Sequence, residues 1–368
     1  MKIIINQSDL LKQINIAQKA ISARTTMQVL EGILFEAKDG YLTLLATDFD
    51  MAIITKTACT IEEEGSIVIN STLFGNITRK LPDSPVSITV KDKNIKIKCE
   101  SIEFNLTGLD PIEYPSLPEV ETDKKLLISE ELLSKSIKHT LFSTSIDDTR
   151  PALMGVLLDI ERDNINFVSL DGYRLSRVRI NIDDAPDIKV IIPARSLGEL
   201  VKIIEPGQDI KISTMSGHIL FEFGDTKFYS RLLEGKFVDY VSILNEKYSS
   251  YVKINRQSMV DSLERISLLA REDKARLVKI LLDDNTLEIK SNTEIGDGYE
   301  KLSCELEGEG INIAFNNKYL LEGIKVIDTD EIKINLKGMI NPVTIEPIDG
   351  DIDYTYLVLP VKLKSEEF

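Results

Sequence analysis

The side chains best able to carry out catalysis are few in this chain, and they do not fall into catalytic spacings. The two histidines, His139 and His218, lie outside any metal-binding or nucleophile motif. The sequence also lacks the glycine-rich phosphate loop that ends in Gly-Lys-Ser/Thr and the Gly-x-Ser-x-Gly turn of serine hydrolases. We therefore expect no catalytic residues, and a hydrolase is the enzyme-class alternative that these features disfavour.

One acidic segment begins like a calcium-binding loop. The aspartates of residues 349–353 alternate as EF-hand ligands do, but Tyr354 stands at the glycine position and Pro360 at that of the terminal glutamate. The three cysteines are too widely separated for a Cys-x-x-Cys site; they are Cys59, Cys99 and Cys304. We expect neither a metal nor a cofactor.

The sequence also predicts where the protein resides. An odd number of scattered thiols fits a reducing compartment better than a disulfide framework. Residues 1–7 become polar after three consecutive isoleucines, which is too short for a signal-peptide core. No apolar run approaches the ~18 residues that a membrane span requires. We therefore expect a cytoplasmic protein that does not enter a membrane.

One order of predicted elements occurs three times along the chain. Each copy opens with a short strand and a one-faced helix, in residues 2–21, 125–142 and 251–270. A related apolar strand follows at residues 32–36, 155–159 and 279–283. A second helix follows at residues 71–81, 194–205 and 316–327. The copies are offset by 123 and 124 residues, so the repeated unit is a whole domain, because solenoid repeats span only ~20–50 residues.

The repeat predicts an α+β fold of three tandem similar domains, each with two helices packed on antiparallel sheets. Alternating apolar residues between 86 and 106 mark strands with one buried face. Short polar segments separate the copies, and we place the domains at residues 1–122, 125–246 and 249–368. The alternative, three unrelated domains of similar composition, is disfavoured by the matched order of every element.

The net charge of −16 argues against DNA binding when it is taken alone, because such binding relies on neutralising phosphates. Each of the six predicted helices, however, is neutral or carries a small net positive charge. One interpretation is that the helices line a surface that faces DNA, while the rest forms an acidic exterior. The other is that Lys and Arg are good helix formers on solvated faces. The threefold repeat favours the first, because equivalent helices can share one concave face.

Six segments of the chain carry a family likeness. They are SARTTMQVLEGILFE at 22–36, TDFDM at 47–51, RPALMGVLLD at 150–159, SLDGYRL at 169–175, GKFVDY at 235–240 and LVLPVKL at 357–363. Together they resemble the bacterial DNA polymerase III beta subunit family, the sliding clamps, over residues 1 to about 363. No single segment is diagnostic, whereas all six in order, on three repeated domains, are specific.

The resemblance implies a processivity subunit that holds a replicative polymerase on duplex DNA and has no catalytic activity. It implies a head-to-tail homodimer, closed into a ring whose hole is lined by helices. At the dimer interface Ile102, Phe104 and Leu106 are expected to face Leu268 and Leu269 of a second copy. The alternative for these residues is the ordinary core of their own domain. The alternative for the whole protein is an acidic scaffold that never encircles DNA.

Sequence-independent contacts to double-stranded DNA are implied by the resemblance at Arg24 and Arg150. Four further basic residues are candidates on charge alone, each with a solvated surface role as its alternative. They are Arg79, Lys80, Lys138 and Lys202.

The resemblance also implies an apolar cleft between the second and third domains. It would bind short peptides of the polymerase alpha subunit, the clamp loader, repair polymerases and ligase. Its expected residues are Leu170, Tyr173, Arg174, Leu175, Val238, Ile243, Leu357, Leu359, Pro360 and Lys362. Thr, Pro and Arg are common in the family at the positions of Leu170, Val238 and Lys362, so we expect a different peptide preference.

Overall fold

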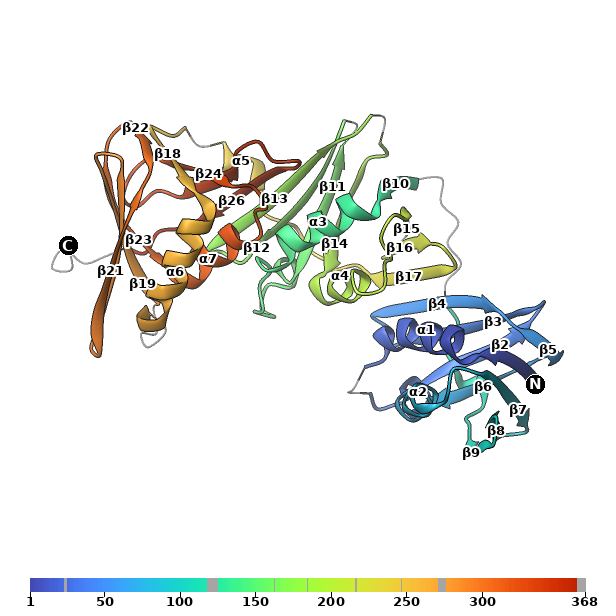
Figure 1. Ribbon diagram of the computed structural model, residues 1–368. Coiled ribbons are helices and arrows are strands. Elements are labelled where there is room, and N and C mark those ends of the chain that lie inside the picture. The colour runs from blue at the N-terminus through green and yellow to red at the C-terminus, as the bar shows by residue number, and fades with distance from the viewer. Residues whose placement is uncertain are drawn as a thin grey trace. The chain divides into compact units, whose positions relative to one another are not determined.

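The computed structural model describes residues 1–22, 25–117, 125–161, 163–183, 185–215, 217–245, 247–270 and 276–362 (Figure 1). The chain divides into two compact units. The first unit consists of Met1–Leu133 and Arg195–Leu232, and the second of Ser134–Ala194 and the residues from Leu233 onward.

Two antiparallel sheets make up most of the first unit. The five-stranded sheet has the order β5 (Thr60–Glu63), β1 (Lys2–Asn6), β7 (Pro85–Lys91), β8 (Asn94–Cys99) and β9 (Ile102–Thr107). The eight-stranded sheet has the order β10 (Lys125–Ser129), β15 (Asp209–Met215), β16 (His218–Phe223), β17 (Thr226–Arg231), β4 (Met51–Ala58), β3 (Tyr41–Thr47), β2 (Gly32–Lys38) and β6 (Gly65–Asn70).

The second unit also contains two antiparallel sheets. The nine-stranded sheet has the order β14 (Ile188–Pro193), β11 (Gly155–Glu161), β12 (Asn164–Leu170), β13 (Arg174–Asn181), β26 (Asp353–Val358), β25 (Val343–Pro347), β24 (Glu331–Leu336), β18 (Ser250–Asn255) and β22 (Glu305–Glu307). The four-stranded sheet has the order β21 (Gly296–Ser303), β20 (Thr286–Thr293), β19 (Leu277–Asp283) and β23 (Ile311–Asn316).

The strand order confirms the predicted threefold repeat. One four-stranded pattern occurs as β1-β7-β8-β9, β10-β15-β16-β17 and β18-β24-β25-β26. A second occurs as β6-β2-β3-β4, β14-β11-β12-β13 and β23-β19-β20-β21. The first repeat thus holds β1–β9, the second β10–β17 and the third β18–β26. The α+β fold follows directly, because each repeat adds two helices to these sheets.

All six predicted helices form, although their ends differ from the expected ones. They are α1 (Gln7–Ala17), α2 (Ser71–Lys80), α3 (Glu130–Leu141), α4 (Ala194–Leu200), α6 (Arg256–Ala270) and α7 (Asn317–Lys325). The largest error concerns α4, which ends at Leu200 because the chain turns there and buries Ile203 and Ile204. One further helix, α5 (Tyr240–Leu244), was not predicted, because it is too short to show a helical period.

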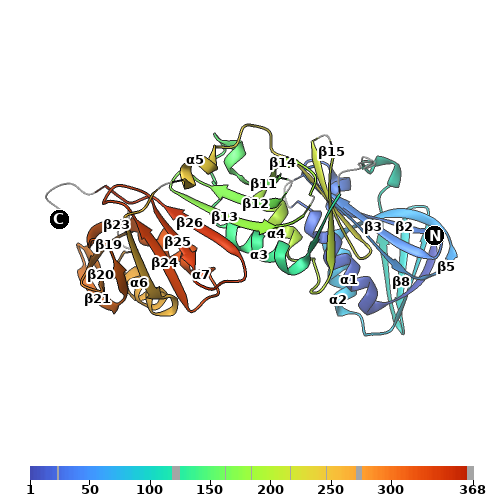
Figure 2. The same cartoon turned by 90° about the horizontal axis from the view of Figure 1, so that it is seen from above.

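Side-chain caps and apolar faces explain where the helices begin and how they pack. The Asn70 side chain accepts a hydrogen bond from the Leu73 amide (2.9 Å) at the start of α2, and Asn316 does the same for α7. Leu10 and Ile14 of α1 are fully buried. Helices α1 and α2 lie side by side in both views, and α6 lies beside α7 (Figures 1 and 2).

Each large sheet joins strands of two successive repeats. In the first unit β17 pairs with β4, so that Tyr229 lies opposite Ala52. In the second unit β26 pairs with β13, so that Leu357 lies opposite Leu175. The corresponding strands β9 and β21 form sheet edges instead. Backbone hydrogen bonds between repeats therefore use the same two kinds of strand each time.

Candidate functional site

A cluster of apolar side chains lies in the second unit where β12, β13 and β26 meet the segment that leads into α5. Its buried members are Leu153, Leu157, Val168, Leu170, Leu175, Ile191, Phe237, Tyr240 and Leu357, with Ala152, Leu233, Ile243 and Leu244 packed against them. Large apolar side chains are also exposed on the same segments: Tyr173 is 61% exposed, Val238 41% and Leu359 38%. Exposed apolar groups of this kind suit the binding of apolar side chains from a partner.

The turn between β12 and β13 holds Tyr173 beside Leu359. The Asp171 carboxylate accepts hydrogen bonds from the amides of Tyr173 (2.9 Å) and Arg174 (3.1 Å). Gly172 has a φ of 94°, a conformation that glycine adopts without strain. The Leu359 amide donates to the Tyr173 carbonyl (2.9 Å), which ties the end of β26 to the turn.

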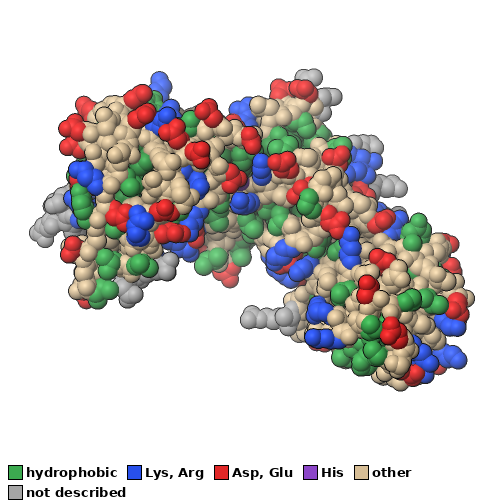
Figure 3. All heavy atoms as spheres, in the orientation of Figure 1, with side chains coloured by type: hydrophobic (Ala, Val, Ile, Leu, Met, Phe, Trp, Pro, Cys, Tyr) green, Lys and Arg blue, Asp and Glu red, His purple; other side chains and the backbone are tan. Residues whose placement is uncertain are grey.

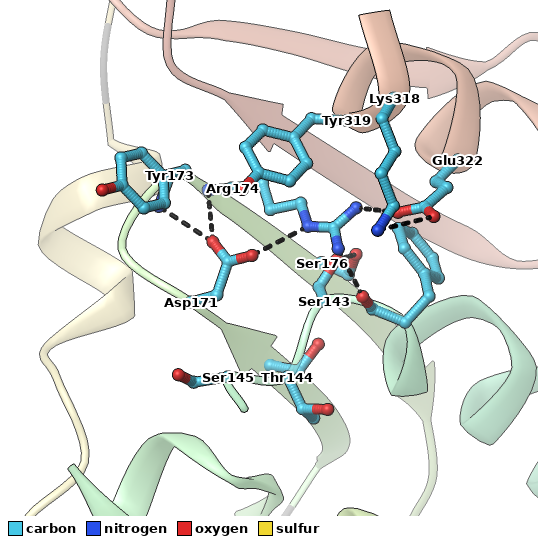
Figure 4. Close-up of polar contacts among 12 residues, drawn as sticks. Ser143, Thr144, Ser145, Asp171, Tyr173, Arg174, Ser176, Lys318, Tyr319 and Glu322 are labelled. Carbon is cyan, nitrogen blue, oxygen red and sulfur yellow. Dashed lines mark hydrogen bonds and ion pairs between the residues drawn. The ribbon is translucent and has the colours of Figure 1, made fainter. Parts of the chain in front are cut away.

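Arg174 is only 7% exposed, and its guanidinium is occupied by other groups of the chain (Figure 4). Its Nε donates to Asp171 Oδ2 (3.0 Å), its Nη2 donates to the Phe142 carbonyl (2.7 Å), and its Nη1 pairs with Glu322. Glu322 belongs to α7, so Arg174 links the second repeat to the third. We expected Arg174 to line the apolar cleft, and the structure buries its side chain among these partners.

The electrostatic surroundings of Arg174 keep it charged. Burial by itself lowers the pKa of the guanidinium, but Tyr356, Glu322 and Asp171 raise that pKa above its ordinary value. The guanidinium also lies over the Tyr319 ring, 4.5 Å from its centroid. Tyr319 in turn stacks on Tyr173, with ring centroids 5.9 Å apart (Figure 4). Arg174 therefore supports the exposed ring of Tyr173 through Tyr319.

Tyr240 anchors the segment that carries Val238 and Ile243. Its hydroxyl donates to Asp159 Oδ2 (3.0 Å) on β11, and burial raises the pKa of this hydroxyl. Asp159 also pairs with Lys189 (2.7 Å). Tyr240 was not predicted as a site residue, although it lies in the GKFVDY segment and its aromatic type was the available signal.

The structure separates the expected cleft residues into a base and an exposed layer. Leu170, Leu175 and Leu357 are buried in the apolar cluster, and Ile243 packs against it. Pro360 is half-buried and Lys362 is exposed beyond β26, where the Val361 amide donates to the Ala314 carbonyl (2.7 Å).

The residues expected at a dimer interface lie at two sheet edges or beside them. Phe104 on β9 is 39% exposed, and Ile102 and Leu106 are half-buried, so they do not form the core of their own repeat. Glu103 lies on the same strand as Phe104, and hydrogen bonds from Lys96 and Lys98 of β8 lower the pKa of its carboxyl to about 2. Because this charge is paired within its own sheet (Lys96 at 2.8 Å), it does not block further pairing of the edge.

The other edge, β21, is backed by α6. Leu268 of α6 is 66% exposed, and Leu269 is half-buried. A Cβ atom on Gly298 would lie 3.0 Å from Leu269 Cδ1 and 3.1 Å from Ile266 Cδ1. The leucine side chain thus lies directly against the glycine positions of the edge strand.

The candidate DNA-contacting residues are exposed but differ in their surroundings. Arg79 and Lys80 end α2, where Arg79 donates to Asn76 (3.1 Å) and Asn15 (3.3 Å). Lys138 lies 3.8 Å from Asp328. Lys202 pairs with Glu199 (2.7 Å) and lies in the turn after α4, not on the helix as expected.

The last two candidates, Arg150 and Arg24, are the DNA contacts that the family resemblance implied. Arg150 precedes a single 3-10 turn, Pro151–Leu153, and its Nη1 lies 3.9 Å from the place of a Cβ on Gly172. It is therefore close to the turn that carries Tyr173. Arg24 lies outside the described residues. On the face seen in Figure 3, Lys and Arg side chains are interspersed with Asp and Glu side chains.

Two negative findings apply to the described residues alone. No group of His, Cys, Asp or Glu side chains there is arranged to hold a metal ion. None of the helices there has the length and apolar character to cross a membrane.

Comparison with family models settles the family. The models of the N-terminal, central and C-terminal domains of the DNA polymerase III beta subunit match residues 1–118, 127–239 and 241–362. The chain belongs to the DNA polymerase III beta subunit family. The likeness stated from the sequence segments is thus confirmed.

Individual relatives agree along the whole chain. The beta sliding clamp of Staphylococcus aureus is 34% identical over 375 residues, which cover 98% of this chain and 99% of that protein. The sliding clamp structure from Bacillus subtilis is 32% identical, with a TM-score of 0.95 over 99% of this chain and 100% of that one. The sliding clamp of Pseudomonas aeruginosa bound to griselimycin is 26% identical, with a TM-score of 0.94 and the same coverage. These relatives favour the sliding clamp over the acidic scaffold.

Removal of the Arg174 side chain should destabilise the joint between the second and third repeats. Arg174→Ala leaves the Asp171 and Glu322 carboxylates without their shared buried partner, so we expect a loss of about 3–5 kcal/mol. Lys318→Ala is the control, because Lys318 is half-exposed and 3.8 Å from Glu322, which predicts a loss below ~1 kcal/mol. Urea denaturation followed by circular dichroism measures both, and equal effects would contradict the role given to Arg174.

Proposed function

We propose that this chain is the sliding clamp of a replicative DNA polymerase, a head-to-tail dimer that encircles duplex DNA and holds the polymerase on it. The observation that carries this proposal is the pairing between repeats. Strands β9, β17 and β26 end one of the repeated four-stranded patterns, and β4, β13 and β21 end the other. Within the chain β17 pairs with β4 and β26 pairs with β13, so that β9 and β21 remain.

The remaining edges, β9 and β21, are suited to pair with each other in two copies. Phe104 occupies on β9 the position that Phe228 has on β17, three residues into the strand after the hairpin that pairs it with its neighbour. Gly298 occupies on β21 the position that Ile53 has on β4, because Gly298 lies opposite Ser291 of β20 as Ile53 lies opposite Ala46 of β3.

The internal registers then predict the register between copies. Phe228 lies opposite Ile53 in the first unit, and Tyr356 lies opposite Ser176 in the second. By the same rule Phe104 of one copy lies opposite Gly298 of the other. Because Gly298 has no side chain and lies against Leu269, the phenyl ring has an apolar neighbour there.

Closure into a ring follows from the type of interface. A head-to-tail contact that does not close continues into a filament, whereas a closed ring leaves no edge of either kind. Two copies supply six repeats joined by six equivalent strand pairings. The domain limits of residues 1–122, 125–246 and 249–368 remain a prediction.

Encirclement makes strong DNA contacts unnecessary. Non-specific binding to phosphates has a Kd of ~10⁻⁴–10⁻⁶ M and weakens with salt, which permits sliding. We assign this weak contact to Arg24, Arg79, Lys80, Lys138, Arg150 and Lys202, and the net charge of −16 disfavours binding to the outside. The proposed clamp has no catalytic role and acts in the cytoplasm.

The exposed apolar side chains above the second unit's cluster are the proposed docking site for partner peptides. Tyr173, Val238 and Leu359 supply contacts, and the buried leucines keep the surface in place. We assign to it short segments of the polymerase alpha subunit, the clamp loader, repair polymerases and ligase. A griselimycin-bound structure of a relative supports a ligand site on this fold.

Single charged substitutions on either edge should separate the dimer. Phe104→Asp and Leu268→Asp each place a carboxylate in the proposed apolar contact, so the dimer Kd should rise at least about tenfold. Ile340→Asp is the control, because Ile340 is an exposed apolar residue in the loop between β24 and β25 and belongs to neither edge strand. Light scattering should give about twice 41.4 kDa for the unaltered chain and the control. A dimer unaffected by both variants would exclude this interface.

The encirclement itself can be tested with DNA topology. The protein is loaded by a clamp loader onto nicked circular plasmid, which is then linearised. We expect it to stay on circles and to leave linear DNA through the ends, because a ring is retained by topology and not by affinity. Gel filtration of the labelled protein with the DNA measures this. Equal retention on both forms would favour an ordinary DNA-binding or scaffold protein.

The peptide site predicts a loss of binding without a loss of stability. Tyr173→Ala combined with Leu359→Ala removes exposed contacts, so the affinity for a polymerase alpha-subunit peptide should fall by about thirtyfold or more. The thermal midpoint and the dimer mass should stay unchanged. Calorimetric titration measures the affinity, with Leu127→Ala as a control at an exposed residue of β10 in the first unit. Unchanged affinity in the double variant would place the site elsewhere.

A further inference from the structure

The first unit contains a cavity of about 160 Å³ at the joint between the first and second repeats. Its lining includes Phe49, Asp50, Ala52, Pro115, Tyr229 and Arg231. Beneath it, Ala52 and Tyr229 are buried in a small apolar cluster with Leu220. The proposed DNA and peptide contacts do not use this cavity.

The cavity occupies the place that corresponds, by the internal repeat, to the peptide surface of the second unit. Asp48 accepts hydrogen bonds from the amides of Asp50 (3.2 Å) and Met51 (3.0 Å). This is the turn that Asp171 forms with the amides of Tyr173 and Arg174. The spacing between the two turns is 123 residues, the offset of the repeat itself.

The strands that flank the two turns also correspond. The Arg231 amide donates to the Asp50 carbonyl (2.8 Å), as the Leu359 amide donates to the Tyr173 carbonyl (2.9 Å). Ala52 lies opposite Tyr229 as Leu175 lies opposite Leu357. Pro115 precedes Val238 by the same 123 residues. The cavity is thus built from the counterparts of the peptide-binding residues.

Phe49 provides an independent indication that this cavity is used. Its φ of 74° is a left-handed backbone conformation that residues other than glycine adopt only with strain. The corresponding residue of the second unit is Gly172, which has no such strain. Phe49 is nevertheless 55% exposed, so its ring contributes little to the core. A strained, exposed aromatic residue at the rim of a cavity points to a binding role.

We propose that this cavity is a second peptide-docking site, which takes one aliphatic or aromatic side chain followed by an acidic residue. Its volume suits a single side chain, because pockets for whole ligands measure ~300–1,000 Å³. Arg231 is exposed at the rim and makes no ion pair among the described residues, so it can receive a carboxylate. Asp50 at the same rim disfavours a second acidic residue. The inference rests on the proposed function, since the peptide role of the second unit's surface is itself proposed.

The number of bound peptides tests this proposal. The probe is the pentapeptide Gly-Leu-Phe-Asp-Gly, labelled with fluorescein and measured by equilibrium dialysis against the full chain. We expect two peptides per chain. One should remain in the Tyr173→Ala/Leu359→Ala variant, one in Phe49→Gly, and none when all three substitutions are combined. Phe49→Gly should not lower the thermal midpoint, because it relieves the left-handed strain.

The acidic residue has its own control. Against the Tyr173→Ala/Leu359→Ala variant, the probe with Asn in place of Asp should bind at least fivefold more weakly, and Arg231→Gln should remove this difference. If the double variant binds nothing, the cavity proposal is wrong and the proposed function stands. If Phe49→Gly removes the only site, the cavity is right and the peptide surface of the second unit is wrong. Two sites retained in Phe49→Gly, or no binding to any variant, would overturn the cavity proposal.

Discussion

The structure depends on one kind of contact, the antiparallel pairing of an edge strand of one repeat with an edge strand of the next. Unpaired edge strands expose backbone amides and carbonyls that will pair with any suitable strand. The chain makes two such pairings internally, β17 with β4 and β26 with β13. It leaves β9 and β21 at sheet edges, and in the proposed dimer these edges pair, so that assembly continues the fold by the same kind of hydrogen bonds.

The same contact creates the surface that we propose for partner peptides. The turn that begins β13 and the end of β26 come from different repeats, and only their pairing brings Tyr173 next to Leu359. Arg174 then reinforces this joint from below, through ion pairs with Asp171 and Glu322. A buried charge cluster is a costly way to join two domains unless its geometry is well satisfied, and here each guanidinium nitrogen has a partner.

The acidic character of the chain is compatible with a protein that surrounds DNA. A binding protein that relies on affinity needs a concentrated positive patch, whereas a closed ring needs only weak attraction along its inner wall. In the proposed clamp, exposed cations such as Arg79 and Lys80 supply this weak attraction. Lys138 and Lys202 already have a carboxylate nearby, so in the proposed clamp their attraction to phosphate is weaker, which suits sliding better than tight binding.

The sequence by itself determined the α+β fold, the threefold repeat and the segments that name the family, because periodicity and repeated spacing are local properties of the chain. Only the tertiary structure decided which side chains are accessible. Arg174, Leu175 and Leu357 were expected alike to line an apolar cleft, but the leucines are buried at its base and Arg174 is buried in a cluster of polar contacts. Phe104 shares the apolar alternation of a core strand and is exposed because its sheet ends there. Exposure of a strand residue depends on the strand beside it, which the residues of that strand do not encode.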